Sequence, residues 1–356
     1  MRIECPKCLR INSISGDYVV THKRALEHCC PQCKTDIQIQ LVLPAASGKN
    51  ITDGPSAHDR QTRLISPVAE SEEGTKIFSL KSKILRSLVE LPPMPNIILK
   101  ARQIMGDPAS SLKDLSGVIE HDPAIVARVL ALANSAYYGL SGLVSSIQHA
   151  SILLGQRTLG ELITIAASSR LLSKKLKGYQ LNPGDLWKHS LAVALGSKII
   201  AEKKNPLWVE DAFIAGLLHD AGKIILDPYV LEHAKVFKKF LNGGRQKNFE
   251  AEKEILGFDH AEVMSRAARF WRYPKTQTAA IRYHHYPQLA GDCELAYIVH
   301  LADFVAQEAG FRSERTAASP EMDPQALNRL GFQQEQLNTV IAQVAASVEQ
   351  LATELQ

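Results

Sequence analysis

An imidazole and a carboxylate stand side by side at His219-Asp220, directly after an apolar run that ends at Leu218. Such a pair can offer one nitrogen and one oxygen ligand to a single metal ion. Gly222 is expected to let the backbone turn, and Lys223 brings a positive charge to the same place. The pair alone decides nothing, because histidines also cap helices and lie hydrogen-bonded in protein cores.

More imidazole and carboxylate side chains occur on both sides of this pair, each on or beside an apolar helical pattern. They are His189, His260, His284, His285 and Asp303. Nitrogen and oxygen ligands in this mixture suit zinc, iron, manganese or nickel, and the set is large enough for one or two ions. The same groups could instead form a hydrogen-bonded network in a helical core without metal.

A second candidate metal site consists of two Cys-x-x-Cys pairs near the N-terminus, separated by residues 9–29. The four thiols are Cys5, Cys8, Cys30 and Cys33. Two such turns can close a tetrahedral thiolate cage around one zinc ion, which would supply folding free energy to a short segment. Cys29 is a possible substitute for Cys30. A redox dithiol is the alternative, although that chemistry needs only one pair.

The composition is that of an ordinary globular protein, with 45% hydrophobic and 22% charged residues in a chain of 356. A net charge of +4 gives no support for binding to nucleic acid or to a membrane surface. We expect no membrane span, because no apolar run approaches about 18 residues. The N-terminus has no apolar signal core, and the cysteines are spaced for metal rather than for disulfides. The sequence therefore predicts a cytoplasmic protein.

The elements that must position the central residues are helices. Asp122-Pro123 predicts a helix start, and Ser146 predicts another helix that Gly155 ends. Strand signals are almost absent after residue 76, and alternation around residues 37–43 predicts a strand near the cysteines. Around the candidate site the apolar spacing predicts helices over 185–200, 210–218, 260–271, 276–285 and 294–309. The expected fold is therefore an all-α bundle preceded by a small β zinc ribbon.

The chain is expected to comprise five segments. These are a zinc ribbon at 1–42, a flexible linker at 43–75, an N-terminal helical bundle at 76–177, a helical core at 178–310, and a polar segment with an amphipathic helix at 311–356. The apolar positions of the last helix indicate that it packs back on the body. A homodimer contact is the alternative.

Several longer stretches carry a family pattern in addition to the ligand order. They are Leu91-Pro92-Pro93-Met94-Pro95, His121-Asp122-Pro123, Ser146-Ile147-Gln148-His149-Ala150 and Gly257-Phe258-Asp259-His260-Ala261-Glu262. Together, over residues 83–305, they resemble the HD superfamily of metal-dependent phosphohydrolases and, within it, the HDOD subfamily of bacterial signalling proteins. The N-terminal cysteine segment looks like a bacterial zinc ribbon.

The resemblance implies a set of ligands for two ions. One ion would be held by His189, His219, Asp220 and Asp303, and a second would share Asp220 and add His260, His284 and His285. A single-metal site remains an alternative. Lys223 matches a phosphate-contacting lysine of the HD-GYP phosphodiesterases, which cleave cyclic di-GMP. Those enzymes resemble this chain less after the histidine pair, because Tyr286-Pro287-Gln288 replaces the glutamate and the Gly-Tyr-Pro loop.

Two functions follow from the resemblance. The first is a non-catalytic regulatory module that docks signalling proteins or senses a nucleotide or phosphoester ligand at the metal site. The alternative is a metal-dependent phosphohydrolase acting on a nucleotide or cyclic nucleotide, with Lys223 in a catalytic role. Such an enzyme should gather several cationic side chains at the metals. The sequence offers Lys223, with Arg282 as a second candidate, which favours the regulatory module.

Overall fold

The structure is a computed structural model in which the chain divides into two compact units, Met1–Ser66 and Pro67–Gln356. Each unit is described by itself. The residues that the structure describes are 2–4, 11–13, 25–29, 36–40, 80–88, 96–107, 110–119, 122–242, 247–314 and 320–354.

The described residues of the first unit form two antiparallel strand pairs. Strand β1 (Arg2–Glu4) pairs with β2 (Ile11–Ser13), and β3 (Ala25–Cys29) pairs with β4 (Asp36–Gln40). The strand predicted around residues 37–43 thus corresponds to β4. The four predicted zinc ligands, Cys5, Cys8, Cys30 and Cys33, lie outside the described residues.

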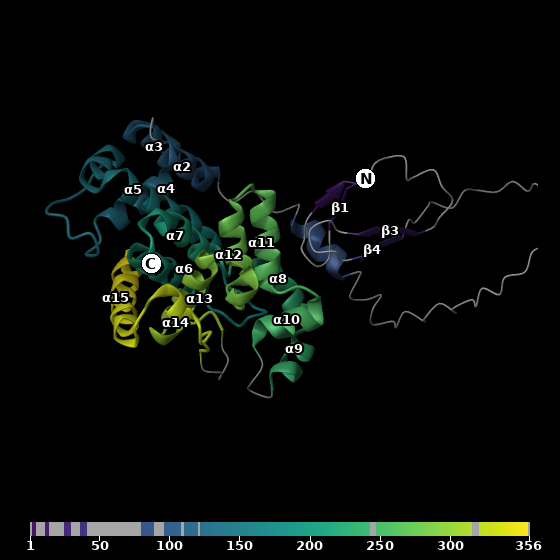
Figure 1. Ribbon diagram of the computed structural model, residues 1–356. Coiled ribbons are helices and arrows are strands. Elements are labelled where there is room, and N and C mark those ends of the chain that lie inside the picture. Colours follow the sequence, from purple (N-terminus) through teal and green to yellow (C-terminus); the bar gives the residue numbers. More distant parts are fainter. Residues whose placement is uncertain are drawn as a thin grey trace, which may run out of the picture. The chain divides into compact units, whose positions relative to one another are not determined.

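The second unit is helical, which confirms the predicted all-α body. Residues 80–88 are helical, and four further helices gather at one end of the unit (Figure 1). These are α2 (Asn96–Gly106), α3 (Leu112–Ile119), α4 (Pro123–Ala133) and α5 (Ile147–Leu172). Helix α5 packs against α2, α3 and α4, so it joins the group together.

The predicted helix starts at Asp122 and Ser146 are confirmed. The Asp122 side chain accepts hydrogen bonds from the first amides of α4, with Pro123 at the first helical position. Ser146 caps α5 in the same way. Gly155 interrupts α5 with φ 78°, a left-handed conformation that glycine adopts without strain. A kink inside α5 therefore stands where the sequence predicted a helix end.

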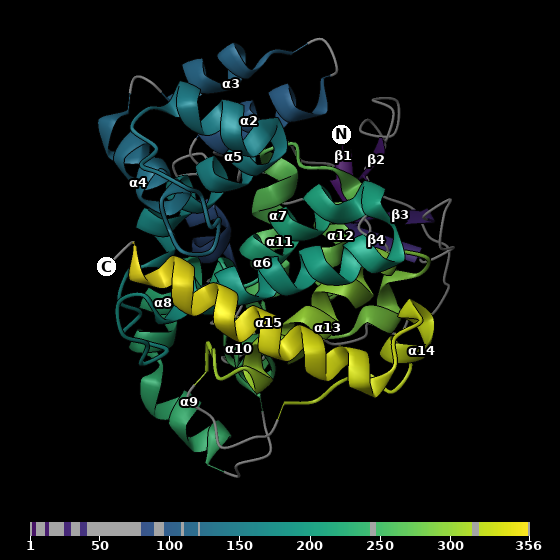
Figure 2. The same ribbon diagram turned by 90° about the vertical axis from the view of Figure 1, so that its left-hand side faces the viewer.

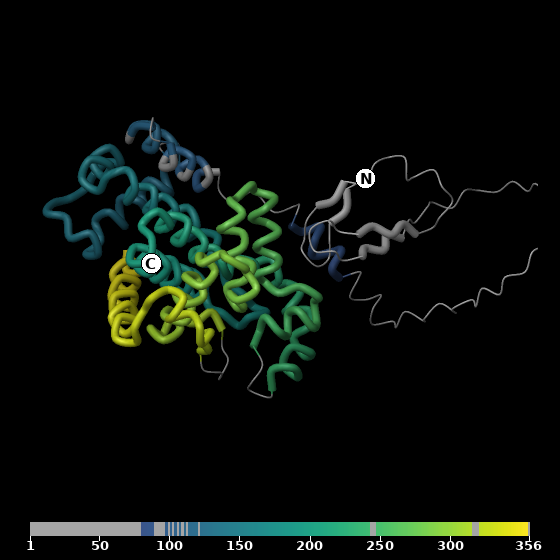
Figure 3. The backbone as a smooth tube through the Cα atoms, in the orientation of Figure 1, coloured from purple at the N-terminus to yellow at the C-terminus, as the bar shows by residue number. Residues whose placement is uncertain are grey.

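The remaining helices carry the candidate site, and their path can be followed in Figure 3. They are α6 (Asp185–Lys204), α7 (Val209–Leu218), α8 (Gly222–Glu232), α9 (Ala234–Leu241), α10 (Asn248–Leu256), α11 (His260–Phe270), α12 (Lys275–Tyr283), α13 (Glu294–Glu308), α14 (Ala326–Leu330) and α15 (Gln334–Thr353). Two 3₁₀ turns, η2 (Pro206–Trp208) and η3 (Pro287–Ala290), connect them. Helix α8 ends and α9 begins on either side of His233.

Helix α6 lies at the centre of this unit. It packs against α7, α13 and α15, and its apolar side chains are buried around most of its circumference. A helix that is apolar on all sides is stable only inside a core. Helix α15 runs along α6 and α13 (Figure 2) and buries Leu337, Val340, Val344 and Val348 within the chain. Its apolar face is thus covered by the body.

No helix in the part of the chain that the structure describes is long and apolar enough to cross a membrane.

Two glycines on either side of His219-Asp220 allow helices to approach closely. A Cβ atom at Gly216 would meet Ser197 on α6, and one at Gly222 would clash with the main-chain carbonyl of His260 on α11. Gly222 has no left-handed backbone angle, so it does not provide the turn that the sequence suggested. Its role is to bring α8 against the start of α11.

Replacing Gly222 with alanine should therefore destabilise the fold. We expect a loss of about 1–3 kcal/mol in the free energy of unfolding, because the backbone of α11 must shift to admit a methyl group. Chemical denaturation measures this. Gly117→Ala is the control, since a Cβ atom there meets nothing and Gly117 lies inside α3. That substitution should stabilise by up to about 1 kcal/mol. Equal effects at both positions would contradict the packing role of Gly222.

Candidate metal centre

Six helices around the centre bring all seven predicted side chains together. His189 lies in the second turn of α6, and Asp303 lies in α13. His219-Asp220 occupies the junction between α7 and α8, and His260 is the first residue of α11. His284 and His285 follow the end of α12. Six of these side chains are buried and His285 is half-buried. Helix ends thus supply most of the polar groups.

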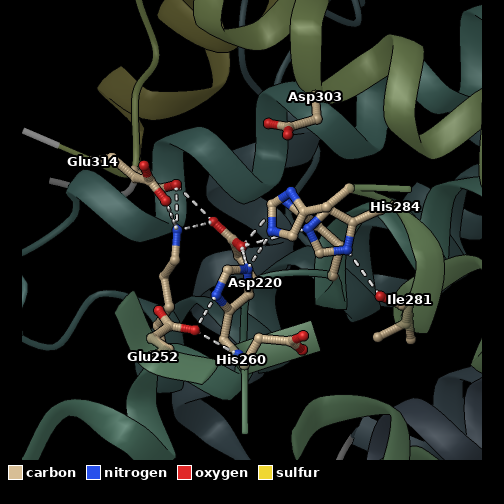
Figure 4. Close-up of polar contacts among 12 residues, drawn as sticks. Asp220, Glu252, His260, Ile281, His284, Asp303 and Glu314 are labelled. Carbon is tan, nitrogen blue, oxygen red and sulfur yellow. Dashed lines mark hydrogen bonds and ion pairs between the residues drawn. The ribbon is translucent and has the colours of Figure 1, made fainter. Parts of the chain in front are cut away.

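Asp220 is the hub of the cluster (Figure 4). Its Oδ1 atom lies 2.9 Å from Nε2 of His260, 3.6 Å from Nε2 of His219 and 4.0 Å from Nε2 of His284. Its Oδ2 atom lies 3.3 Å from Nε2 of His189, which is 3.4 Å from a carboxylate oxygen of Asp303. One oxygen of the Asp220 carboxylate therefore faces three histidines, and the other faces His189.

Three histidines are held so that the same ring nitrogen faces the cluster. Nδ1 of His189 lies 2.9 Å from the carbonyl of Phe311, that of His219 lies 2.7 Å from the carbonyl of Gly216, and that of His284 lies 2.8 Å from the carbonyl of Ile281. A carbonyl only accepts, so each Nδ1 carries the proton. In a neutral ring Nε2 is then a free lone pair, as in metal-bound histidines.

The inward nitrogens crowd each other. Nε2 of His189 and Nε2 of His219 are 3.2 Å apart. Nε2 of His284 is buried and has no hydrogen-bond partner among the described residues. A buried polar atom without a partner is costly. A cation held by these nitrogens would give Nε2 of His284 a partner, so the residues fit a metal ion.

His260 is oriented by a carboxylate instead of a carbonyl. The fully buried Glu252 on α10 accepts hydrogen bonds from Nδ1 of His260 (2.8 Å) and from its main-chain amide (2.6 Å). Tyr179 donates its hydroxyl to the other oxygen of Glu252 at 2.8 Å. A carboxylate behind a histidine fixes the ring and makes it a stronger metal ligand.

The charge states follow from burial and from the nearby carboxylates. Burial, reinforced by His189, lowers the pKa of His219 to about 3, although Asp220 opposes the shift. Burial lowers the pKa of His260 as well, but Glu252 and Asp220 outweigh it and raise that pKa to about 10. Without a cation, His260 therefore carries a proton that a metal ion would replace.

The pKa values of the other three histidines also shift in opposite directions. Burial and the neighbouring imidazoles hold the pKa of His284 and of His285 well below the usual range. Burial also opposes the charging of His189, yet the bond to Asp220 and the charge of Asp303 raise its pKa above the usual value. The neutral rings are those farthest from carboxylates.

Three overlapping groups of ligand atoms lie within 4.8 Å of one another. They are His189, His219 and Asp220; His219, His284 and Asp303; and His260, His284 and His285. The first lies within the ligand set that the resemblance implied for one ion, the last lies within the set implied for the other, and the middle one joins residues of both sets. His285 is also stacked on Phe249, with ring centroids 4.0 Å apart.

Lys223 lies beside the cluster and contacts Asp220 directly. Its buried ammonium donates to Oδ2 of Asp220 (2.8 Å), to the hydroxyl of Ser313 (2.9 Å) and to Glu314 (3.5 Å). Ser313 in turn donates to Asp220 at 2.6 Å. Burial lowers the pKa of Lys223, but Asp220 and Glu314 outweigh it and raise that pKa above the usual value. The lysine is therefore charged.

A cavity opens onto the cluster from outside. It is lined by Asp220, Lys223, Lys247, Phe249, His285, His300, Asp303, Gln307, Arg312, Ser313, Glu314, Pro320 and Glu321. Two of its cationic side chains, Lys247 and Arg312, did not stand out in the sequence. Lys247 pairs with Glu321 at 2.7 Å.

Some site contacts were missed or misplaced by sequence analysis. Arg282, the second cationic candidate, bonds to Asp259 and Glu262 instead of facing the cluster. His300 supports the site by donating from Nδ1 to the carbonyl of His284 at 2.7 Å, while Nε2 accepts from the amide of Asp323. Its apolar setting in α13 gave no sign of this contact.

The sequence and the fold both have known relatives. Residues 91–287 match the sequence model of the HDOD domain. A protein of Treponema pallidum (strain Nichols), described as uncharacterized, is 24% identical over 233 residues, which cover 63% of this chain and 43% of that protein. The chain thus spans less than half the length of that relative.

Solved structures with similar folds include three bacterial proteins. An HDOD domain protein of unknown function from Geobacter sulfurreducens has a TM-score of 0.66 and 25% identity, covering 78% of this chain and 98% of that one. A protein from Shewanella amazonensis SB2B, provisionally described as a phosphohydrolase, has a TM-score of 0.61 and 26% identity, covering 77% and 98%. A protein from Marinobacter aquaeolei VT8, provisionally described as a signal transduction protein, has a TM-score of 0.62 and 22% identity, covering 81% and 66%.

Proposed function

Since this chain belongs to the HDOD domain family, we propose that it is a regulatory module of bacterial signal transduction that binds divalent metal without hydrolysing a phosphoester. One or two ions (Fe, Mn, Zn or Ni) would be held by the seven clustered His and Asp side chains. The observation that carries the metal site is the set of Nε2 atoms that converge on Asp220, with Nε2 of His284 buried and unpartnered among the described residues.

A bound metal ion would polarise a phosphoryl oxygen or acidify a bound water. The chain's own residues favour binding over turnover. Lys223, the candidate phosphate contact, is engaged by Asp220, Ser313 and Glu314. The predicted second cation, Arg282, is bonded elsewhere. In this proposal the site binds or senses a ligand, and other surfaces dock signalling proteins.

A metal-dependent phosphohydrolase acting on a nucleotide or cyclic nucleotide is the second candidate. Lys247 and Arg312 favour it, because both line the cavity beside the cluster and could contact a phosphate. The likeness to the Shewanella amazonensis protein, provisionally described as a phosphohydrolase, points the same way.

Turnover assays separate the two functions. The metal-loaded chain and its Asp220→Asn variant would be assayed on a panel of phosphomonoesters, nucleotides and cyclic dinucleotides. We expect the wild-type chain to release no more product than the variant. Robust turnover that disappears with Asp220→Asn would overturn the regulatory assignment and establish the hydrolase.

Glu252 should matter for metal affinity although it is not a proposed ligand. Replacing it with glutamine removes the carboxylate behind His260 and should weaken metal binding by about 10–100-fold. Competition with a fluorescent chelator measures this affinity. Glu254→Gln is the matched control, because Glu254 lies in the same helix and is exposed. If both variants bind metal like the wild type, Glu252 has no role in ligand orientation.

We further propose that Cys5, Cys8, Cys30 and Cys33 hold one structural zinc ion. Their spacing supports this, as do the short strand pairs in the same segment. The five predicted segments of the chain, with boundaries at residues 42, 75, 177 and 310, are part of this proposal as well. A homodimer through α15 would have to use the polar face of that helix, since its apolar face is buried within the chain.

A further inference from the structure

The Lys223 ammonium is saturated by the chain itself. An ammonium group has three N–H donors, and Lys223 contacts three acceptors, on Asp220, Ser313 and Glu314. The side chain is 1% exposed, so water does not provide a further acceptor. An anion entering the cavity can therefore reach this lysine only if one of the three acceptors leaves.

Glu314 is the acceptor that can leave. Ser313 is buried and bridges Lys223 to Asp220 with bonds of 2.9 and 2.6 Å. The Glu314 contact is longer, at 3.5 Å, and its side chain is 24% exposed. Partly exposed ion pairs with long contacts contribute little to stability. Rotation of the Glu314 side chain toward solvent would open one position on Lys223.

The main chain before Glu314 is fixed, so this rotation needs no larger movement. Gly310 ends α13 with φ +92°, and the amide of Phe311 donates to the carbonyl of Ala306 at 2.9 Å. The carbonyl of Phe311 accepts from His189 at 2.9 Å. Arg312, in the next position, is exposed and lines the same cavity. The segment thus presents a cation and a displaceable carboxylate at the mouth of the site.

We propose that Glu314 is a built-in competitor for an anion site formed by Lys223 and Arg312, and that a phosphate group must displace its carboxylate to bind. A lysine ammonium binds phosphate as it binds a carboxylate, and a phosphate dianion carries the larger charge. Removing the Glu314 charge should therefore expose the site. This inference deepens the proposed function, because the anion site opens onto the same Asp220 cluster.

The test is binding of inorganic phosphate to the full chain, measured by isothermal titration calorimetry. Glu314→Gln keeps the size of the side chain and removes its charge. We expect this variant to bind phosphate at least about tenfold more tightly than the wild type. Adding Arg312→Gln should reverse most of that gain. Glu321→Gln is the matched control, because Glu321 lines the same cavity but pairs with Lys247. It should stay within about twofold of the wild type.

Equal phosphate affinity of Glu314→Gln and the wild type would overturn the inference, whether both bind or neither does. An equal gain in Glu321→Gln would also overturn it, since the effect would then be a general change of cavity charge. Metal content of the same preparations separates this inference from the proposed function. If core metal is present but Glu314→Gln shows no gain in phosphate affinity, only the competitor role of Glu314 is refuted. If core metal is absent, the proposed metal centre is refuted. The phosphate affinities of Glu314→Gln and Glu321→Gln still decide the role of Glu314.

Discussion

Replacing Lys223 with methionine should lower the free energy of unfolding of the chelator-treated chain by about 3–5 kcal/mol. The ammonium makes the shortest charged contact to the buried Asp220 carboxylate among the described residues, and without it only the protonated His260 ring, at 2.9 Å, lies as close to that charge. The effect is large because Asp220 is 2% exposed and water cannot take the place of Lys223. Urea denaturation of the two proteins measures the difference.

Two further variants show whether the charge pair causes this loss. Combining Lys223→Met with Asp220→Asn should recover part of it, with a coupling energy of about 1–3 kcal/mol. Lys247→Met is the control, since Lys247 lines the same cavity but pairs with the exposed Glu321. Lys247→Met should lower the free energy of unfolding by less than about 1 kcal/mol. If Lys223→Met and Lys247→Met cost the same, the buried pair is not a stabilising element.

Removal of metal should have the second large effect. At a metal concentration about 1,000 times its Kd, binding stabilises the folded state by about 4 kcal/mol. For a unit of this size that corresponds to a Tm shift of roughly 8–16 °C. We therefore expect chelation to lower the Tm of the wild-type helical unit by this amount, as followed by differential scanning calorimetry.

The same scan on two histidine variants locates the effect. His219→Ala removes a buried member of the cluster and should make the Tm insensitive to chelator. His149→Ala removes an exposed histidine on α5 and should keep the wild-type response. A chelator response that survives in His219→Ala would place the stabilising metal outside the cluster.

The sequence was sufficient to predict most of the fold and the proximity of seven side chains. Helix starts at Asp122 and Ser146 depend on local chemistry, which a sequence displays directly. The His and Asp residues occur at helix ends or on apolar faces, and such faces must pack together. The HDOD resemblance, confirmed by the match over residues 91–287, gave the order of these residues.

Contacts made by polar segments could not be predicted in this way. Glu252 lies in α10 with Glu250 and Glu254, and only the packing of α10 decides which carboxylate faces His260. Ser313 and Glu314 follow the last core helix in a stretch whose polarity predicts an exposed loop. The turn at the end of α13, where Gly310 has a positive φ of 92°, directs the chain so that both side chains contact Lys223.

The roles of two other residues depended on tertiary geometry. Gly222 follows a His-Asp pair in a manner typical of a turn, yet it is needed because α11 approaches too closely for a Cβ atom. Arg282 lies two residues before the histidine pair, but its side chain bonds to Asp259 and Glu262 instead of facing the cluster. The spacing of residues along one helix does not show which atoms of the neighbouring helix lie next to them.

The most direct test of the metal centre is the metal content of the full chain purified without chelator, measured by plasma emission for the wild type and for Asp220→Asn. The account predicts one zinc per chain in both proteins, from the N-terminal cysteines, and one or two additional divalent ions in the wild type alone. Equal metal content in the two proteins would contradict it. The clustered histidines would then form a hydrogen-bonded polar core rather than a metal site.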